Sequence, residues 1–203
     1  MTRKYSSRRR EENAQQTRQA IVDAAIKLHG KGITVLSVVA EEAGVSLPTV
    51  SKYFPTREDL FTACTGHVAA NLEYQSPETF AAIKDPAERL RQVVHEIFRL
   101  HEEIAGQSWT GYRLEDESPV LAQAMADYEE TIVTLIEVLS FENATDDRDI
   151  MMRLARAMLH PLTYRALRVK NGVGFEAAVK NMTLALAAVL NIEVSDVHQK
   201  TMP

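Results

Sequence analysis

The fold class predicted by this sequence is all-α, with about nine helices. Apolar residues recur at helical spacing over long stretches, whereas no stretch shows strand alternation or a hairpin turn. Two of these stretches begin with residues that favour the start of a helix, namely Asp85-Pro86 followed by Glu88, and Ser118-Pro119. Together these observations predict a helical protein without internal repeats.

The composition is that of a soluble globular protein: 203 residues, of which 45% are hydrophobic and 25% charged. The polar, basic start lacks the apolar segment of a secretory signal, and the longest purely apolar run, Leu184–Leu190, is too short to span a bilayer. The one cysteine, Cys64, excludes an intramolecular disulfide and is expected to be a small buried hydrophobe. We therefore expect a cytoplasmic protein without a membrane partner.

Charge is distributed unevenly along the chain, whose net charge is -5. Residues 1–62 hold 10 Lys/Arg and 7 Asp/Glu, whereas the remaining residues hold 13 and 21. The split indicates an N-terminal module that can approach phosphates, joined to an acidic module that cannot. An uneven solvated surface is the alternative.

Residues 1–18 are basic and contain little that can pack, so we expect a disordered tail. Such a tail either keeps the protein soluble or adds phosphate or minor-groove contacts. The first helix is expected over Thr17–Lys31, where Gly30 and Gly32 end it.

The stretch Thr34–Arg57 has the layout of a helix-turn-helix, in which two short helices are joined by a tight turn. Leu36, Val39 and Ala40 share one face of the first helix by their i, i+3, i+4 spacing. Gly44 suits the left-handed position that ends this helix.

The second helix of the motif begins after Ser46, which can cap it, and tolerates Pro48 in its first turn. Val50 and Phe54, four residues apart, are expected to face the core. The residues left on the outer surface are Leu47, Thr49, Ser51, Lys52 and Tyr53. Beside the leucine, they supply two short hydroxyls, one cation and one aromatic hydroxyl.

Thr56 and Asp59 form a capping-box-like start for the next helix, and Ser76-Pro77 breaks the pattern. We therefore expect two domains, residues 1–75, with the motif at about 34–54, and residues 76–203. In the second domain Gly106–Gly111 is expected to be a break. The expected helices there run from Pro86 to about His101, from Pro119 to about Phe141, from Arg148 to Lys170 with a kink at Pro161, and from Phe175 to about Leu190, with a polar loop at Asn143–Asp149.

The last two helices have unusually broad apolar surfaces, which favours burial on more than one side. We expect them to form a four-helix interface in a symmetric homodimer; the alternative is a central core helix in a monomer. The candidate interface residues are Met151, Leu154, Met158, Leu162, Met182, Leu186 and Val189.

A small-molecule pocket is expected in the second domain, lined by apolar and aromatic side chains with one histidine as a polar contact. Ordinary core packing is the alternative for each of these residues. Few of them are basic, which favours a bulky neutral or cationic, apolar-aromatic ligand. The candidates are Trp109, Tyr112, Met125, Tyr128, Met158, His160 and Tyr164.

Catalytic and metal-binding patterns are missing from the sequence. His95-Glu96 and His101 resemble a zinc-protease motif, but histidines six residues apart point in different directions from a helix. The chain contains no GxSxG, Walker, GxGxxG or CxxC motif. We expect a protein without enzymatic activity, cofactor or metal.

The chain resembles the tetracycline-repressor (TetR) family of bacterial transcriptional regulators. The similarity covers about a quarter of the chain and is carried by Ala24-Ala25, Val39–Ser46, Thr49-Val50, Lys52–Phe54 and Arg57–Leu60. It implies a homodimer whose paired recognition helices enter successive major grooves of a pseudo-palindromic operator.

The resemblance also implies roles for individual residues. Thr34 would cap the second helix and face a phosphate, and Tyr53 and Arg57 would hold the DNA backbone. Thr49 and Lys52 are the candidates for contact with base edges or with nearby phosphates. The remaining candidates at the interface are Ser46 and Ser51, with Leu47 and Pro48 available for a thymine methyl group. His29 stands where such proteins usually have a core phenylalanine.

The leading hypothesis is thus a homodimeric repressor released from its operator by a small-molecule effector. One alternative is a DNA-binding regulator whose second domain only dimerises or binds a protein partner. Another is an all-α binding protein or enzyme without DNA binding. Thermal shifts with ligands and salt-dependent binding to duplex DNA discriminate among the three.

Overall fold

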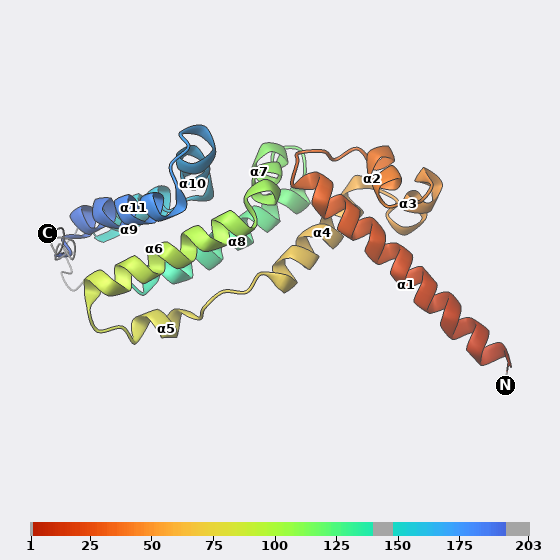
Figure 1. Cartoon of the computed structure of the whole chain (residues 1–203), viewed down its shortest axis with the longest axis horizontal. Coiled ribbons are helices and arrows are strands. Elements are labelled where there is room, and N and C mark those ends of the chain that lie inside the picture. Colours follow the sequence, from red (N-terminus) through yellow and green to blue (C-terminus); the bar gives the residue numbers. More distant parts are fainter. Residues whose placement is uncertain (1, 140–147, 194–203) are drawn as a thin grey trace, which may run out of the picture. The chain divides into compact units, whose positions relative to one another are not determined.

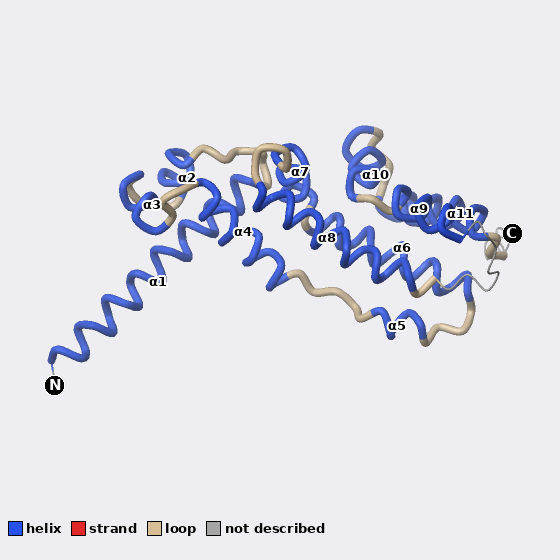
Figure 2. Tube along the Cα trace, turned by 180° about the vertical axis from the view of Figure 1, so that it is seen from behind, coloured by secondary structure: helices blue, strands red, loops and turns tan. Residues whose placement is uncertain are grey.

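The computed structural model describes residues 2–139 and 148–193, and within these ranges every regular element is a helix (Figures 1 and 2). The all-α fold class is confirmed. These ranges contain eleven α-helices and one π-helical turn, η1. Their bounds are α1 Thr2–His29, α2 Leu36–Glu42, α3 Leu47–Tyr53, α4 Arg57–Asn71, α5 Pro77–Ala81, α6 Pro86–Glu103, α7 Ala105–Leu114, α8 Pro119–Glu137, α9 Arg148–Met158, α10 Pro161–Arg165, η1 Ala166–Lys170 and α11 Phe175–Leu190.

The chain divides into two compact units. Unit 1 comprises Met1–Leu72 and Gly106–Met125, and unit 2 comprises Glu73–Ala105 and Ala126–Pro203. The sequence suggests one cut after residue 75, whereas the structure groups the segment from Gly106 to Met125 with the N-terminal helices.

Helix α1 begins at Thr2, so the expectation of a disordered tail over residues 1–18 is wrong (Figure 1). Residues 8–20 are exposed apart from the half-buried Ala14 and Thr17, and the first buried residue is Ile21. The low packing capacity of this stretch is therefore seen as a helix whose side chains, from residue 8 to residue 20, are mostly exposed. The helix ends at His29, and Gly32 adopts a φ of 78° in the following turn.

The two helices and the tight turn of the helix-turn-helix are confirmed. Gly44 adopts a φ of 65°, and the Val45 amide donates to the Ala40 carbonyl, which closes the turn after α2. Val39 and Val50 are fully buried and Phe54 is 1% exposed.

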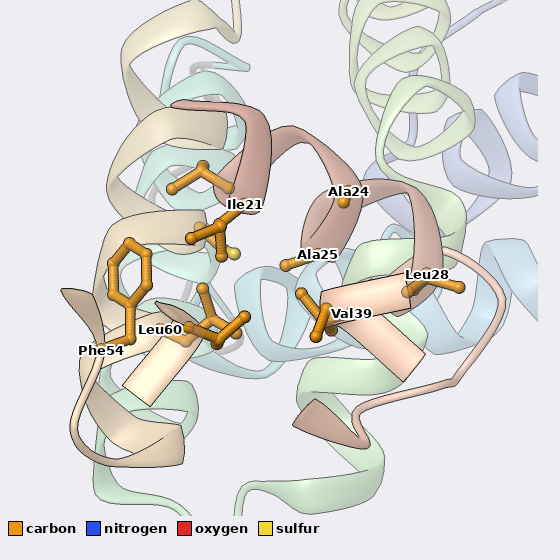
Figure 3. Packing of buried hydrophobic residues seen from close by; sticks show 11 residues of the cluster. Ile21, Ala24, Ala25, Leu28, Val39, Phe54 and Leu60 are labelled. Atoms are coloured by element: carbon orange, nitrogen blue, oxygen red, sulfur yellow. The ribbon is translucent and has the colours of Figure 1, made fainter. Parts of the chain in front are cut away.

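One core joins the helices of this motif to α1 and α4 (Figure 3). The capping box that starts α4 is also confirmed, because the Thr56 hydroxyl accepts from the Asp59 amide while the Asp59 carboxylate accepts from the Thr56 amide. These local signals fix where each helix begins. The core residues include Ile21, Ala24, Ala25, Leu28, Val39, Phe54 and Leu60.

Helix α7 contradicts the break expected at Gly106–Gly111, since it runs through both glycines. A Cβ on Gly106 would lie 2.2 Å from the Gly30 carbonyl oxygen, and a Cβ on Gly111 would lie 2.5 Å from the Met125 sulfur. The two glycines therefore allow close packing within unit 1 and do not end a helix.

Within unit 2, α11 packs against both α6 and α9, and α5 packs against α6. Asp85 caps α6 by accepting from the Ala87 amide, as predicted. Helix α11 has the predicted bounds. The helix expected to kink at Pro161 instead stops at Met158, and His160 caps a new helix, α10, by accepting from the Leu162 amide.

Helix α8 ends at Glu137, before the expected end at about Phe141. Most of the polar loop expected at Asn143–Asp149 lies outside the described residues.

Candidate nucleic-acid interface

Helix α3 is held at its start by Ser46. The Ser46 side chain accepts from the Thr49 amide at 3.3 Å, and the hydroxyls of Ser46 and Thr49 lie 2.8 Å apart. Pro48 occupies the first turn, where a missing N–H costs nothing. Since the Thr49 hydroxyl bonds within the cap, it would have to exchange or share that bond in order to contact a base.

The outward face of α3 carries most of the predicted contact residues. Leu47 is 43% exposed, and Pro48, Ser51 and Lys52 are also exposed. The Lys52 Nζ lies 5.8 Å from the centre of the Tyr53 ring, a distance suited to a cation–π contact. A cation supported by an aromatic ring is therefore presented beside the exposed hydroxyl side chain of Ser51.

Arg57 lies at the start of α4, where its guanidinium stands 5.3 Å from the Phe61 ring centre. It also lies 3.9 Å from carboxylate oxygens of Glu58 and Glu117. The Glu58 carboxylate accepts from the Ser118 hydroxyl at 2.6 Å. Arg57 is thus part of a polar cluster within unit 1, in which any phosphate would compete with two carboxylates.

Thr34 does not cap α2, contrary to the expectation. The residue in the N-cap position is Val35, which has no side chain able to accept a hydrogen bond there. Thr34 therefore precedes the cap by one residue and is half-buried.

Arg18 is a candidate contact residue that the sequence analysis does not identify. It is exposed on α1, and its guanidinium carbon lies 5.1 Å from the centre of the Phe54 ring, directly after α3. A cation one turn before the first core residue, Ile21, is the sequence signal that identifies it.

The structure distributes the expected pocket residues between the two units. Trp109, Tyr112 and Met125 belong to unit 1, where Met125 packs against Gly111. The others belong to unit 2, where Tyr128, His160 and Tyr164 lie around the segment that follows α9; Met158 is half-buried there.

His101, which the sequence analysis treats only as a failed metal ligand, is the centre of this unit 2 cluster. Its Nε2 donates to the Leu159 carbonyl at 2.8 Å, so its Nδ1, 2.6 Å from the Tyr128 hydroxyl, accepts from that hydroxyl. Its ring centre lies 5.5 Å from that of Tyr164. Burial lowers the pKa of His101 to about 4, although the bond to Leu159 opposes this shift.

A second polar group in unit 2 involves Tyr164, whose hydroxyl donates to the Glu102 carboxylate. Arg168 donates to the same carboxylate at 2.7 Å and to the Val173 carbonyl at 2.7 Å. The hydrogen bond from Arg168, together with that from Tyr164, lowers the pKa of Glu102. These bonds fix η1 against α6, so the Tyr164 hydroxyl already has a structural role.

The expected dimer residues differ in their exposure. Leu154 and Leu162 are 46% and 40% exposed, whereas Met182 and Leu186 are 9% and 0% exposed within unit 2. Met151, Met158 and Val189 are half-buried. Additional exposed apolar side chains in unit 2 are Ile150, Val169 and Leu184.

Burial shifts the pKa of two side chains in unit 1. Burial lowers the pKa of His29 to about 4, and its Nε2 is buried without a hydrogen-bond partner. Cys64 is buried as predicted, and burial raises the pKa of its thiol to about 12, which makes it unreactive.

Within residues 2–139 and 148–193, no group of three or more His, Cys, Asp or Glu side chains is placed to hold a metal ion. In the same part of the chain, the helices are too short or too polar to cross a membrane.

The capped α3 with its exposed polar face, packed on α1 and α4, defines a helix-turn-helix DNA-binding domain. Residues 21–64 match the family model for bacterial regulatory proteins of the tetR family. The matched residues contain the whole core of the motif.

Solved structures of TetR-type regulators are similar over most of the chain. One from Mesorhizobium loti matches with a TM-score of 0.64 at 16% identity, over 88% of this chain and 97% of that one. LfrR from Mycobacterium smegmatis, in complex with proflavine, matches with a TM-score of 0.54 at 26% identity, over 89% and 98%. SCO1917 from Streptomyces coelicolor matches with a TM-score of 0.53 at 22% identity, over 83% and 96%.

The chain therefore has the DNA-binding domain and the fold of the TetR-family transcriptional regulators. No curated protein matches its sequence significantly.

Proposed function

We propose that this protein is a homodimeric repressor that binds a pseudo-palindromic operator and is released by a small-molecule effector. The observation that carries the proposal is the outward face of α3, where Lys52, supported by the Tyr53 ring, stands beside exposed Ser51 and Pro48. Lysine and hydroxyl side chains suit both phosphate and base-edge contacts. Tyr53 and Arg57 would contact the DNA backbone, together with Thr34.

Sequence-specific binding to an operator is tested by using the purified protein to select tight-binding duplexes from a random pool. The proposal predicts enrichment of two inverted half-sites about one helical turn apart, or a multiple of it, because a dimer presents two recognition helices. Enrichment of single half-sites would contradict the dimeric mode of binding, and no enrichment would contradict sequence-specific binding.

Dimerisation is supported by the apolar surface of unit 2. Ile150 and Leu154, one turn apart on α9, are 57% and 46% exposed, and Leu184 on the adjacent α11 is 42% exposed. Exposed apolar side chains on two packed helices are typical of an interface. Among the residues expected from the sequence, Leu154 belongs to this surface and Leu162 is exposed on α10, whereas Met182 and Leu186 are buried within unit 2.

Sedimentation of a Leu154→Glu variant tests the dimer. The charge would be buried at the interface, so the variant should sediment as a monomer while keeping its helical circular dichroism. Ile33→Glu is the matched control, since Ile33 is exposed in unit 1 at 36%. If both variants sediment like the unmodified protein, the interface lies elsewhere.

An apolar-aromatic effector is supported by the aromatic side chains of unit 2 around His101, and by the similarity to LfrR, whose structure contains proflavine. Trp109, Tyr112 and Met125 of unit 1 remain candidates for the same role. Proflavine is therefore the first probe for binding to this chain.

Thermal unfolding with and without proflavine tests the effector, since a ligand of the native state raises Tm by mass action. Titrations with free and operator-bound protein then test release. Reciprocity requires that DNA weaken proflavine binding by the factor by which proflavine weakens DNA binding. Equal affinity for free and operator-bound protein would contradict this mechanism of release.

A further inference from the structure

The N-terminal extension, residues 2–20 of α1, precedes Ile21, the first buried residue of the helix. Its described side chains, from Arg8 onward, are exposed apart from the half-buried Ala14 and Thr17. The extension contains six Lys/Arg and two Asp/Glu, which makes it the most basic stretch of an acidic protein. The extension is thus a long polar helix with a strong positive charge.

The intrinsic stability of such a helix is low. Most helical stability in proteins comes from packing an apolar face, and the first buried residue of α1 is Ile21. The ion pair from Arg8 to Glu12, at 3.0 Å, is exposed and stabilises the helix little. Arg8, Arg9 and Arg10 place three positive charges next to one another in the sequence, so a bound polyanion would stabilise this part of the helix.

The position of the extension relates it to α3 within unit 1. Arg18 lies over the ring of Phe54, the residue that follows α3. The C-terminal end of the extension therefore lies beside the end of α3. At about 1.5 Å per residue, the helix from Arg18 back to Thr2 spans about 24 Å. That length corresponds to about seven base-pair steps of 3.4 Å. Figure 1 shows this part of α1 continuing past α2 and α3 to the N-terminus.

The helical spacing of α1 shows on which face of the helix Arg10 lies. Arg10 and Ile21 are eleven residues apart, which is close to three turns, so they share a face of the helix. At Ile21 this face turns towards the core that contains Phe54. Arg10 therefore lies on the side of α1 that faces α3 and α4 further along the helix.

We propose that the N-terminal extension is a second DNA-contacting element, which binds the phosphate backbone of duplex DNA next to the site occupied by α3. The proposal rests on the DNA-binding function proposed above. Duplex DNA is the partner because its negative charge complements the positive charge of the extension. The extension also lies beside the end of α3, the helix that carries the other contact residues. Its contacts are to phosphates and carry no base specificity.

The test is binding of a fluorescein-labelled, mixed-sequence 30-base-pair duplex over a range of KCl concentrations. The variant is Arg8→Ala/Arg9→Ala/Arg10→Ala, and its charge-conserving partner replaces the same three residues with lysine. The control removes three exposed cations from unit 2, by Lys84→Ala, Lys170→Ala and Lys180→Ala. Lys52→Ala is measured alongside.

The alanine variant should bind at least tenfold more weakly at 100 mM KCl. Its slope of log affinity against log salt should be shallower by about 2–3 per protomer, because each lost phosphate contact removes about 0.9. The lysine variant and the unit 2 control should match the unmodified protein. Hydrogen exchange at residues 8–16 should slow when DNA is added.

Unchanged affinity and salt slope in the alanine variant would overturn the proposal. If Lys52→Ala then weakens binding, only the role of the extension is wrong and the proposed function stands. If the unmodified protein binds no duplex at any salt concentration, both are wrong. An equal loss of binding in the unit 2 control would also overturn the proposal, since the effect would reflect net charge alone.

Discussion

Gly106 lies so close to Gly30 that a Cβ on Gly106 would stand 2.2 Å from the Gly30 carbonyl oxygen and 2.8 Å from its Cα. Two hydrogen bonds surround this contact: the Thr110 hydroxyl donates to the His29 carbonyl at 2.6 Å, and Arg113 donates to the Gly32 carbonyl at 2.8 Å. Helix α7 is thus attached to the end of α1 within unit 1. The side chains of α7 donate to two carbonyls of the turn that ends α1, one of which, that of His29, also accepts from the Gly32 amide.

Gly106→Ala should therefore destabilise the protein. Alanine favours a helix over glycine by about 1 kcal/mol, but the clash is with backbone atoms that cannot move independently, and overpacking costs about 1–3 kcal/mol. The net loss should appear as a lower Tm in thermal unfolding. Gly66→Ala is the control, since a Cβ on Gly66 of α4 meets nothing within 4 Å. That variant should be more stable by up to about 1 kcal/mol, and a more stable Gly106→Ala protein would contradict the close contact.

His29→Phe should stabilise unit 1 at pH 7. The His29 ring packs edge-on against Phe61 at 5.2 Å, and its Nε2 is buried without a partner. Replacing an unsatisfied buried nitrogen with carbon should raise the free energy of unfolding by about 1–2 kcal/mol, as measured in urea. A less stable variant would show that the nitrogen has a partner in solution.

The same pair of proteins should differ in their pH dependence. The pKa of His29 is about 4 in the folded protein and 6.5 in its ordinary state, so the unfolded protein takes up the proton first. The stability contributed by neutral His29 is present above pH 6.5 and is lost as the pH falls towards 4, by up to about 3 kcal/mol. The advantage of His29→Phe should grow over that range. An advantage that is constant between pH 7 and pH 4 would contradict the lowered pKa.

His101→Phe should have the opposite effect, although burial lowers the pKa of both histidines. His101 donates to the Leu159 carbonyl and accepts from the Tyr128 hydroxyl, so phenylalanine leaves two buried polar groups without partners. Each should cost about 1–3 kcal/mol in the free energy of unfolding. Urea titrations of the two phenylalanine variants at pH 7 make the comparison; a His101→Phe protein as stable as the unmodified one would contradict the bonding scheme.

Ser46→Ala should destabilise the helix-turn-helix by about 1 kcal/mol, since Ser46 caps α3. Ser51→Ala, at an exposed position in the same helix, is the control and should change stability by less than about 0.5 kcal/mol. Thermal unfolding of both variants provides the measurement. Equal Tm values for the two variants would show that the cap contributes nothing.

The features predicted correctly from the sequence are those set by local chemistry. Gly44 in its left-handed turn, the Ser46 cap, the Thr56–Asp59 capping box and the bounds of α11 each depend on residues a few positions apart. Propensity, capping and periodicity act over that distance, so a single sequence contains the information.

Several of the features that were not predicted depend on contacts between distant segments. Gly106 and Gly111 have the composition of a break, and only their neighbours Gly30 and Met125 show that the glycines allow close packing. Similarly, the bond from Ser118 to Glu58 joins residues 60 positions apart and has no local signal. For the site, residue type predicted the exposed face of α3. Only the structure shows that the Thr49 hydroxyl takes part in the cap of α3 and that Arg18 lies over the Phe54 ring.

The central claim is that the outward face of α3 binds DNA through Lys52. The most direct measurement is the affinity of the unmodified protein and of Lys52→Ala for a duplex selected by the protein itself, with the salt concentration varied. Lys84→Ala is the control, as an exposed cation of unit 2. The account predicts that Lys52→Ala loses about 1–3 kcal/mol of binding free energy, uniformly across sequences or at one base position, while Lys84→Ala loses none. Unchanged affinity and salt slope in Lys52→Ala would contradict it.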